Sequence, residues 1–294
     1  MEYTPERTPD SIERFRESGE TPTIVSISDI HGYLEAARNA LTAVGKTEAF
    51  DPVVTTDEDG RLHWANNEYL LLINGDLIDR GDRNRECLAL LERLAAEAPP
   101  GHVRYHIGNH EMGVLFPERF HWPGVYSIEL DDDLRRSFIE HVAGGDIAVA
   151  FEGYRHVYSH AGANEEFDVQ VANEQLQEAA RRLLKLLNEG RYDDKQLDVL
   201  EDYDLVFGTG GRLGRGASAG LLWMDFRHMK ERAPPQIVGH SRHVQPTRVG
   251  NAVCQNVIRD NLGSPGGEAV ILESPEDVVA VTNSPVEPTV SELE

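Results

Sequence analysis

The sequence is poor in cysteine and lysine and contains no long apolar run. Its two cysteines, Cys87 and Cys254, lie in apolar settings and form no CxxC pair, which favours buried free thiols over a disulfide or a metal role. No run of roughly 18 or more apolar residues is present, so we expect no membrane-spanning helix. The polar N-terminal segment has no signal-peptide core, and we therefore predict a cytoplasmic protein.

Basic residues are scarce throughout the chain. Lysine and arginine total 28 against 51 aspartate and glutamate residues, which gives a formal net charge of −23, and only four of the basic residues are lysine. This balance disfavours non-specific nucleic-acid binding, which needs a basic surface. We interpret it as halophilic adaptation, because salt screens the self-repulsion of an acidic surface, with an ordinary acidic protein as the alternative. A phosphate-binding site must then be a local positive island built by metals or arginines.

Short β-type runs alternate with amphipathic segments up to about residue 240, and strands separated by glycine, proline and asparagine follow. This order predicts an α/β fold of two packed sheets with helices outside. The predicted strands are 23–30, 68–76, 102–110, 146–153, 155–162, 235–240, 251–258, 268–274 and 278–284. The predicted helices are 33–45, 82–100, 131–142 and 174–190.

One domain is expected over residues 23–282, between two polar ends. Residues 1–22 and 283–294 are expected to be disordered, because they carry few apolar side chains. Residues 50–67 are predicted to form a small surface insertion with a hairpin around the sequence DEDG. Asp82 is expected to cap the helix that follows it.

Five predicted strands end in side chains that bind metals, at the strand ends where open α/β sheets place their sites. The segments are SDIHG, NGDLIDRG, GNHE, SHAG and VGHSRH, and they supply Asp29, His31, Asp76, Asp79, Arg80, Asn109, His110, Glu111, His160 and His240. Any one of these alone is better explained as a turn former, a helix cap or an ordinary histidine. Together they predict a convergent metal site, whose carboxylate, imidazole and amide ligands suit Mn²⁺, Fe or Zn²⁺ better than Ca²⁺ or Mg²⁺ alone.

These segments resemble the signature blocks of the calcineurin-like metallophosphoesterases. GDLIDRG and GNHE are similar to the phosphoprotein phosphatase branch, and the insertion before GDLIDRG looks most like that of bacterial-type (Shewanella-like) Ser/Thr protein phosphatases. The sequence HAG is shared with diadenosine tetraphosphatases of the same superfamily. The resemblance covers residues 23–282 and implies a four-layer α/β/β/α sandwich, with two mixed sheets flanked by helices.

The resemblance also implies a centre of two divalent metal ions that share one carboxylate. Asp29, His31 and Asp76 would hold one ion, and the other would be held by Asp76, Asn109, His160 and His240. Mn is the expected metal, with Fe or Zn as alternatives. The two ions would activate a bridging hydroxide for in-line attack on the phosphate.

By the same resemblance, His110 is expected to be the general acid that protonates the leaving oxygen. Asp79 would orient His110 and keep it cationic. Arg80 would bind the phosphate through its planar guanidinium.

The sequence departs from the family pattern after the dipeptide LW. Related phosphatases have an arginine there that contacts the phosphate, whereas this chain has Asp225. Arg227, Arg212 or Arg215 is expected to replace it. The segment 208–216, which holds the last two, is predicted to be a mobile loop over the site, with an ordinary flexible linker as the alternative.

The preferred function is a metal-dependent phosphoric monoester hydrolase resembling Ser/Thr protein phosphatases. The alternative is hydrolysis of diadenosine polyphosphates, or of other nucleotide or RNA-end phosphates, with the same metals. A non-catalytic scaffold is disfavoured, because it would need neither the complete ligand set nor His110. The expected partner is a phosphorylated protein or a small phosphoester, and no membrane is expected.

Overall fold

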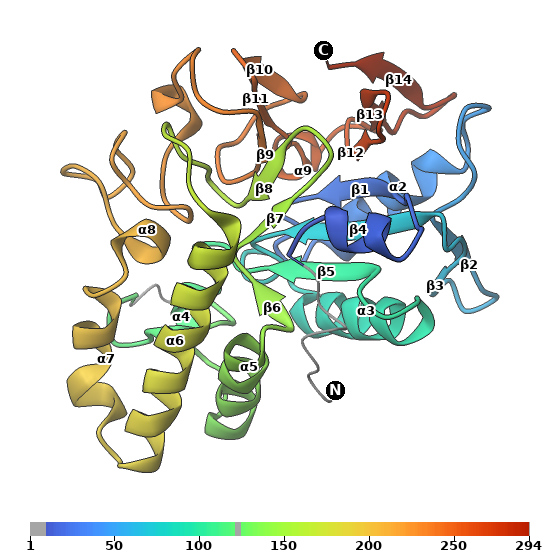
Figure 1. The fold of residues 1–294 in the computed structure, drawn as a ribbon. Coiled ribbons are helices and arrows are strands. Elements are labelled where there is room, and N and C mark those ends of the chain that lie inside the picture. The colour runs from blue at the N-terminus through green and yellow to red at the C-terminus, as the bar shows by residue number, and fades with distance from the viewer. Residues whose placement is uncertain (1–9, 121–124, 294) are drawn as a thin grey trace.

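Two mixed β-sheets stacked face to face form the centre of the computed structural model, which describes residues 10–120 and 125–293 (Figure 1). The seven-stranded sheet has the order β14-β13-β12-β1-β4-β5-β6, and its last four strands run parallel. Its strands are β1 (Thr23–Ile27), β4 (Tyr69–Asn74), β5 (Val103–His106), β6 (Ile147–Ala148), β12 (Ala269–Glu273), β13 (Val278–Thr282) and β14 (Thr289–Glu292).

The second sheet has five strands in the order β10-β11-β9-β8-β7, with β8, β9 and β11 parallel. Its strands are β7 (Ala150–Glu152), β8 (Val157–Ser159), β9 (Gln236–Val238), β10 (Thr247–Val249) and β11 (Ala252–Cys254). A separate hairpin of β2 (Val54–Thr56) and β3 (Leu62–Trp64) confirms the insertion predicted before β4.

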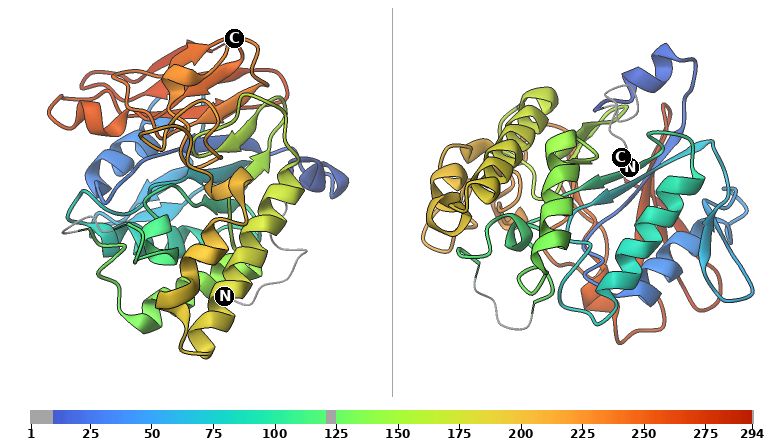
Figure 2. Two further views of the ribbon diagram at one scale, coloured as in Figure 1. Left: turned by 90° about the vertical axis from the view of Figure 1, so that its left-hand side faces the viewer. Right: turned by 90° about the horizontal axis from the view of Figure 1, so that it is seen from below.

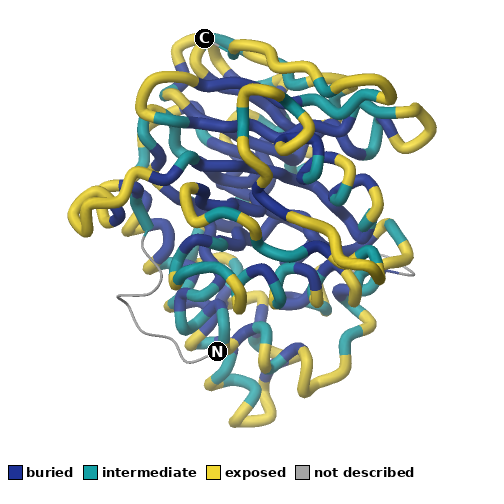
Figure 3. The backbone as a smooth tube through the Cα atoms, turned by 90° about the vertical axis from the view of Figure 1, so that its right-hand side faces the viewer, coloured by how far each residue is buried: buried dark blue, intermediate teal, exposed yellow. Residues whose placement is uncertain are grey.

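An apolar layer joins the two sheets. Ile24 and Leu72 of the larger sheet pack in one cluster with Phe151 and Ile237 of the smaller sheet. Figure 3 shows that buried residues follow the strands, whereas exposed residues gather in the loops and on the outer helices. Successive side chains of the central strands point alternately to the second sheet and to the helices, and both sets are buried. Each central strand therefore has two apolar faces.

Helices flank the sheets on both sides (Figures 1 and 2). Helices α2 and α3 pack on the larger sheet, and α5 and α6 pack on each other and on β6 and β7. The fold class predicted from the sequence, two mixed sheets flanked by helices, is confirmed. The helices are α1 (Glu13–Glu17), α2 (Leu34–Val44), α3 (Asn84–Glu97), α4 (Met112–Leu115), α5 (Asp132–Gly144), α6 (Val169–Asn188), α7 (Tyr192–Leu200), α8 (Asp204–Phe207), the 3-10 helix η2 (Phe226–His228) and α9 (Ile258–Asn261).

The strand predicted at 146–153 is in fact two strands in different sheets. The chain leaves the larger sheet after β6 and enters the smaller one at β7, so Val149 lies at the crossing. The side chain of Asn173 on α6 accepts from the backbone N–H groups of Val149 and Ala150, at 2.9 and 3.1 Å. A single buried amide thus satisfies backbone groups that the sheets leave unpaired.

Two helix starts also differ from the prediction. Helix α6 begins at Val169 rather than at 174, because the Asp168 side chain caps it by accepting from the N–H of Val171 at 3.0 Å. Asp82 does not cap α3: the N-cap residue is Arg83, and no side chain caps this helix. Asn84, the first residue of α3, instead connects the helix to the preceding turn, because its side chain accepts from the N–H of Asp79 at 2.7 Å.

Ordered elements are present in both segments that were expected to be disordered. In the first segment, α1 lies at residues 13–17, and the N–H of Ile12 donates to the carbonyl of Glu152 at 2.8 Å. In the last segment, β14 pairs with β13. The first segment is ordered because Ile12 and Phe15 pack in the apolar layer between the sheets. The composition of the segment does not reveal this packing. Residues 1–9 and 294 lie outside the described residues.

Two further predictions concern the bulk properties of the chain. Both cysteines are buried and free, as predicted. Among the helices that the structure describes, none has the length and apolar character needed to cross a membrane.

The packing of α1 can be tested by truncating its buried aromatic ring. Phe15 is 5% exposed and meets the His102 ring edge-on at 5.2 Å between centroids. We expect Phe15→Ala to lower the free energy of unfolding by about 3 kcal/mol, measured by denaturant titration. Arg14→Ala on the exposed face of the same helix is the control, with an expected change within about 0.5 kcal/mol. Equal effects of the two variants would mean that this segment does not pack on the domain.

Candidate metal centre

Loops that leave five strands bring the predicted ligands together at one edge of the two sheets. The loop after β1 supplies Asp29 and His31, the loop after β4 supplies Asp76, and the loop after β5 supplies Asn109. The smaller sheet contributes the remaining two residues, His160 after β8 and His240 after β9. All six side chains are buried.

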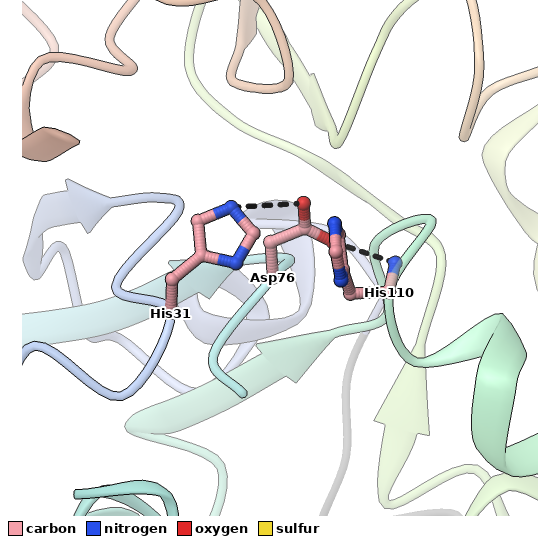
Figure 4. Close-up of side chains that lie close together, drawn as sticks. All are labelled: His31, Asp76 and His110. Carbon is pink, nitrogen blue, oxygen red and sulfur yellow. Dashed lines mark hydrogen bonds and ion pairs between the residues drawn. The ribbon is translucent and has the colours of Figure 1, made fainter. Parts of the chain in front are cut away.

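Asp76 lies between His31 and His110 (Figure 4). Its Oδ2 is 3.4 Å from Nε2 of His31 and 3.4 Å from Nε2 of His160. Its other oxygen accepts from the backbone N–H of His110 at 2.9 Å. One carboxylate therefore contacts groups from both sheets.

The remaining ligands surround this carboxylate. The Asn109 Oδ1 lies 2.8 Å from Nδ1 of His240 and 3.2 Å from Nε2 of His160. Asp29 Oδ1 lies 3.8 Å from Nε2 of His31. Both Asp29 oxygens also have donors, the backbone N–H of His240 at 3.0 Å and the Nδ2 of Asn256 at 2.7 Å. Sequence reasoning missed Asn256, which no motif marks.

The backbone is strained at this site. Within the described part of the chain, every non-glycine residue with positive φ belongs to it, and these residues are Asp29, His31, Asp76, Asp79, Arg80 and His240. L-residues adopt this conformation at a cost, and such strain concentrates at functional sites. Glycines make room beside them: a Cβ at Gly108 would collide with Asp76, and a Cβ at Gly239 would collide with Asp29.

The two buried carboxylates demand positive charge. Burial, together with the nearby Asp76, raises the pKa of Asp29 to about 7, although His160 acts in the opposite direction. Burial also opposes ionisation of Asp76, but its histidine neighbours, His160 first among them, hold the pKa of that carboxyl well below its usual range. Asp76 is therefore the carboxylate that stays ionised.

The three ligand histidines divide according to their charged neighbours. Burial lowers the pKa of His31 to about 3 and holds the pKa of His240 well below its usual range, so both rings are neutral and can donate a lone pair. Burial acts in the same direction on His160, but the adjacent Asp76 carboxylate outweighs it and raises the pKa of His160 to about 9. A proton on His160 thus supplies the positive charge that a divalent ion would otherwise bring.

The donor set fits divalent metal ions. Two groups of ligand atoms, each within 4.8 Å of one another, share Asp76: one is Asp29, Asp76 and His160, and the other is His31, Asp76 and His110. Asp76 belongs to both groups. The grouping differs from the predicted division of ligands in two respects, because Asp29 joins His160 and because His110, expected to be the acid, stands beside His31.

His110 is held by a buried carboxylate. Its Nδ1 is 2.7 Å from Oδ2 of Asp79, which is itself fixed by the N–H and hydroxyl of Ser127, both at 2.8 Å. An arginine N–H of Arg80 lies 3.1 Å from Nε2 of His110. Since arginine can only donate, Nε2 accepts, and the ring proton on Nδ1 is donated to Asp79. The structure thus brings the predicted pair together, and it adds Ser127, for which the sequence holds no signal.

Glu111 fastens the loop that carries Asp76. Its carboxylate is fully buried and accepts from the backbone N–H groups of Asp76 and Leu77, both at 3.0 Å, and of Gly108 at 2.6 Å. Burial and the neighbouring Asp76 raise the pKa of this carboxyl. The motif GNHE contains this residue, but the sequence analysis gave it no role.

A cavity of about 640 Å³ opens above the ligands. Its walls include Arg80, Arg215 and Arg227, whereas the exposed Arg212 is not part of the lining. The Nε of Arg215 donates to Nε2 of His240 at 3.0 Å, so the loop at 208–216 does reach the site.

Asp225, at the position of the missing family arginine, has a structural role here. Its side chain caps η2, accepts from the hydroxyl of Ser241 at 3.3 Å and lies 3.6 Å from the Nε of Arg227. Arg227 is paired with this carboxylate, and its side chain is 62% exposed. Arg215, which donates to a ligand histidine, is therefore better placed than Arg227 or Arg212 to replace the missing arginine.

The role of Glu111 can be tested by replacing its carboxylate with an amide. We expect Glu111→Gln to lower the free energy of unfolding by about 2 kcal/mol, because one amide nitrogen would face backbone donors. Mn²⁺ affinity, measured by competition with a chelator, should fall about tenfold, since the loop that positions Asp76 loosens. Glu86→Gln, on the exposed start of α3, should change neither quantity. Unchanged metal affinity in Glu111→Gln would contradict the positioning role.

Comparison with known proteins places this geometry in a family. Residues 22–241 match the calcineurin-like phosphoesterase family. A Shewanella-like protein phosphatase 2 from Arabidopsis thaliana is 31% identical over 91 residues, a segment that spans 30% of this chain and 20% of that protein. The matched segment thus covers about a fifth of that relative.

Solved structures agree in fold. The crystal structure of a cold-active protein-tyrosine phosphatase of a psychrophile, Shewanella sp., superposes with a TM-score of 0.60 at 16% identity, covering 99% of this chain and 85% of that chain. A second structure, described as a cold-active protein tyrosine phosphatase at 1.1 Å, gives a TM-score of 0.61 at 17% identity and covers 98% and 82% of the two chains. At such identities the likeness is one of fold. Since the family match extends over most of the residues that carry the site, the chain is a hydrolase that belongs to the calcineurin-like metallophosphoesterase family.

Proposed function

We propose that this protein is a metal-dependent phosphomonoesterase that acts on phosphorylated proteins. The observation that supports this most is the convergence at one cavity of a shared metal-binding carboxylate, an imidazole held by a buried aspartate, and guanidinium groups. In hydrolysis of a phosphate ester, the carboxylate would hold metal ions, the imidazole would protonate the leaving oxygen, and the guanidinium groups would bind the phosphate. The attacking water, activated by the metal ions, would need no protein base.

The metal ligands in this proposal are Asp29, His31, Asp76, Asn109, His160 and His240. Bound divalent ions would supply Lewis-acid chemistry, polarising the phosphoryl oxygens and lowering the pKa of water. Mn²⁺ is the proposed metal, with Fe or Zn²⁺ as alternatives of similar ligand preference. The protein contributes the geometry, because strained loops and buried neighbours leave each ligand little freedom.

Two arginines bind the phosphoryl oxygens. Arg80 and Arg215 approach the cluster from different loops, and each donates to an imidazole rather than to a carboxylate. Their charges therefore remain available to an anion. An arriving phosphate competes for the N–H groups of Arg80 and draws them from Nε2 of His110.

His110 then protonates the leaving oxygen. Once Arg80 has turned to the phosphate, Nε2 of His110 can take a proton from solvent water, and the Asp79 carboxylate at Nδ1 stabilises the resulting imidazolium. The proton moves from Nε2 to the ester oxygen as the bond to phosphorus breaks. This assistance matters for serine and threonine alkoxides, which are poor leaving groups.

The substrate class is the least constrained part of the proposal. The similar proteins include a Shewanella-like protein phosphatase and protein tyrosine phosphatases, which supports a phosphoprotein without deciding the amino acid. We propose phosphoserine and phosphothreonine, because a positioned acid is most useful for an alkoxide. A cytoplasmic location and adaptation to high salt remain part of the proposal, and the assays below therefore use molar salt.

Metal dependence is the first test. We expect chelation to abolish hydrolysis of p-nitrophenyl phosphate and Mn²⁺ to restore it. Because the metal must displace the proton of His160, whose pKa is raised to about 9, Mn²⁺ affinity should increase with pH over roughly pH 6 to 9. The same protein is then offered phosphoserine, phosphothreonine and phosphotyrosine peptides and diadenosine tetraphosphate. Faster turnover of the dinucleotide than of every peptide would refute the protein substrate.

The role of His110 is tested by comparing leaving groups. His110→Asn should lower kcat on a phosphoserine peptide by about 10² or more, but much less on p-nitrophenyl phosphate, whose leaving group needs no proton. Metal content, measured by mass spectrometry, should be retained, whereas His31→Asn should lose metal. Equal losses on both substrates, together with lost metal, would instead make His110 a ligand beside His31 and Asp76.

A further inference from the structure

The arginines that line the cavity differ in how their charge is compensated. Arg242 forms an ion pair with Asp260, and Arg227 lies 3.6 Å from a carboxylate oxygen of Asp225. These two arginines are neutralised by the protein itself. Arg242 and Arg227 therefore add little net charge to the cavity that they line.

Arg259 is different. It lies on α9 and lines the same cavity, with its side chain partly buried. Across the described ranges 10–120 and 125–293, its guanidinium has neither a hydrogen bond nor an ion pair. Burial lowers the pKa of Arg259 most, and the charges of Arg242 and Arg80 lower it further, whereas Tyr33 and Asp29 raise it by less. Two further cations therefore lie near this guanidinium.

A partly buried cation beside other cations is unfavourable unless an anion completes the site. Two other arginines are assigned to the scissile phosphate. Arg80 donates to His110, and Arg215 donates to the proposed metal ligand His240. Arg259 makes no such bond, although His31 is near enough for the charge of Arg259 to lower the pKa of that ring. The guanidinium thus borders the phosphate site without being fastened to it.

We propose that Arg259 binds a second anionic group of the substrate, a single carboxylate next to the phosphorylated residue of a peptide. This inference rests on the proposed phosphoprotein function. The planar fork of one guanidinium matches one carboxylate through two parallel hydrogen bonds. Arg259 is therefore a specificity-determining residue rather than a catalytic one.

A carboxylate fits this wall better than a phosphate chain. A longer polyanion would need further unpaired cations, but Arg242 and Arg227 of the same cavity are already paired with Asp260 and Asp225. The net charge of −23 also opposes a strongly acidic ligand beyond the cavity. One uncompensated guanidinium therefore calls for one additional negative charge.

The test compares matched phosphoserine peptides that differ only in glutamate or glutamine, placed directly before or directly after the phosphoserine. For the Mn²⁺-loaded protein, we expect kcat/KM to be about tenfold higher for one glutamate peptide than for its glutamine partner, chiefly through KM. Arg259→Gln should bring this ratio close to one. Arg259→Met, which keeps the apolar stem, should do the same.

Arg227→Gln is the matched control, because it removes another arginine that lines the cavity and that is paired with Asp225. Its ratio should equal that of the wild type. A wild-type ratio of one at both positions, an unchanged ratio in Arg259→Gln, or a ratio lost equally in Arg227→Gln would each overturn the inference. A failure of the proposed function is seen separately, as the absence of Mn²⁺-dependent hydrolysis of p-nitrophenyl phosphate, and would overturn both.

Discussion

Burying Asp29 and Asp76 side by side is the constraint on which the rest of the site depends. Two carboxylates in a low-dielectric interior repel each other and lose their hydration, so each needs donors and a compensating cation. The backbone N–H of His110 and the side chain of Asn256 supply donors. The compensating charge comes from a proton on His160 or from divalent ions, and this competition couples the metal centre to pH.

The same constraint explains the unusual backbone. Side chains from five strand ends reach one site, and the ligands after three of these strands, Asp29, Asp76 and His240, have left-handed backbone conformations. Such conformations persist where the surroundings determine them completely. Glu111 helps to determine the loop that carries Asp76, because its carboxylate accepts from the N–H groups of Asp76 and Leu77.

The sequence predicted the site better than the local structure around it. Ligands at strand ends could be identified because motif and strand coincide. The strand predicted over 23–30, however, ends at Ile27, and Asp29 and His31 adopt left-handed conformations. Asp82 has the residue type of a helix cap, yet no side chain caps α3, and Asn84 accepts from the N–H of Asp79 in the turn before the helix. Long-range partners such as Ser127 left no pattern, since a single side chain recruited through tertiary packing has no period.

The partner of each cavity arginine decides whether its charge is available to the substrate. In a chain with 51 acidic side chains, a guanidinium stays available to a ligand only where the fold keeps carboxylates away from it. At Arg80 and Arg215 neutral imidazole nitrogens fill that place, and such bonds hold the side chain without cancelling its charge. At Arg227 and Arg242 carboxylates do cancel it. The number of arginines at the cavity therefore does not determine its affinity for anions. The partner of each arginine decides which positions can bind phosphate or a neighbouring carboxylate.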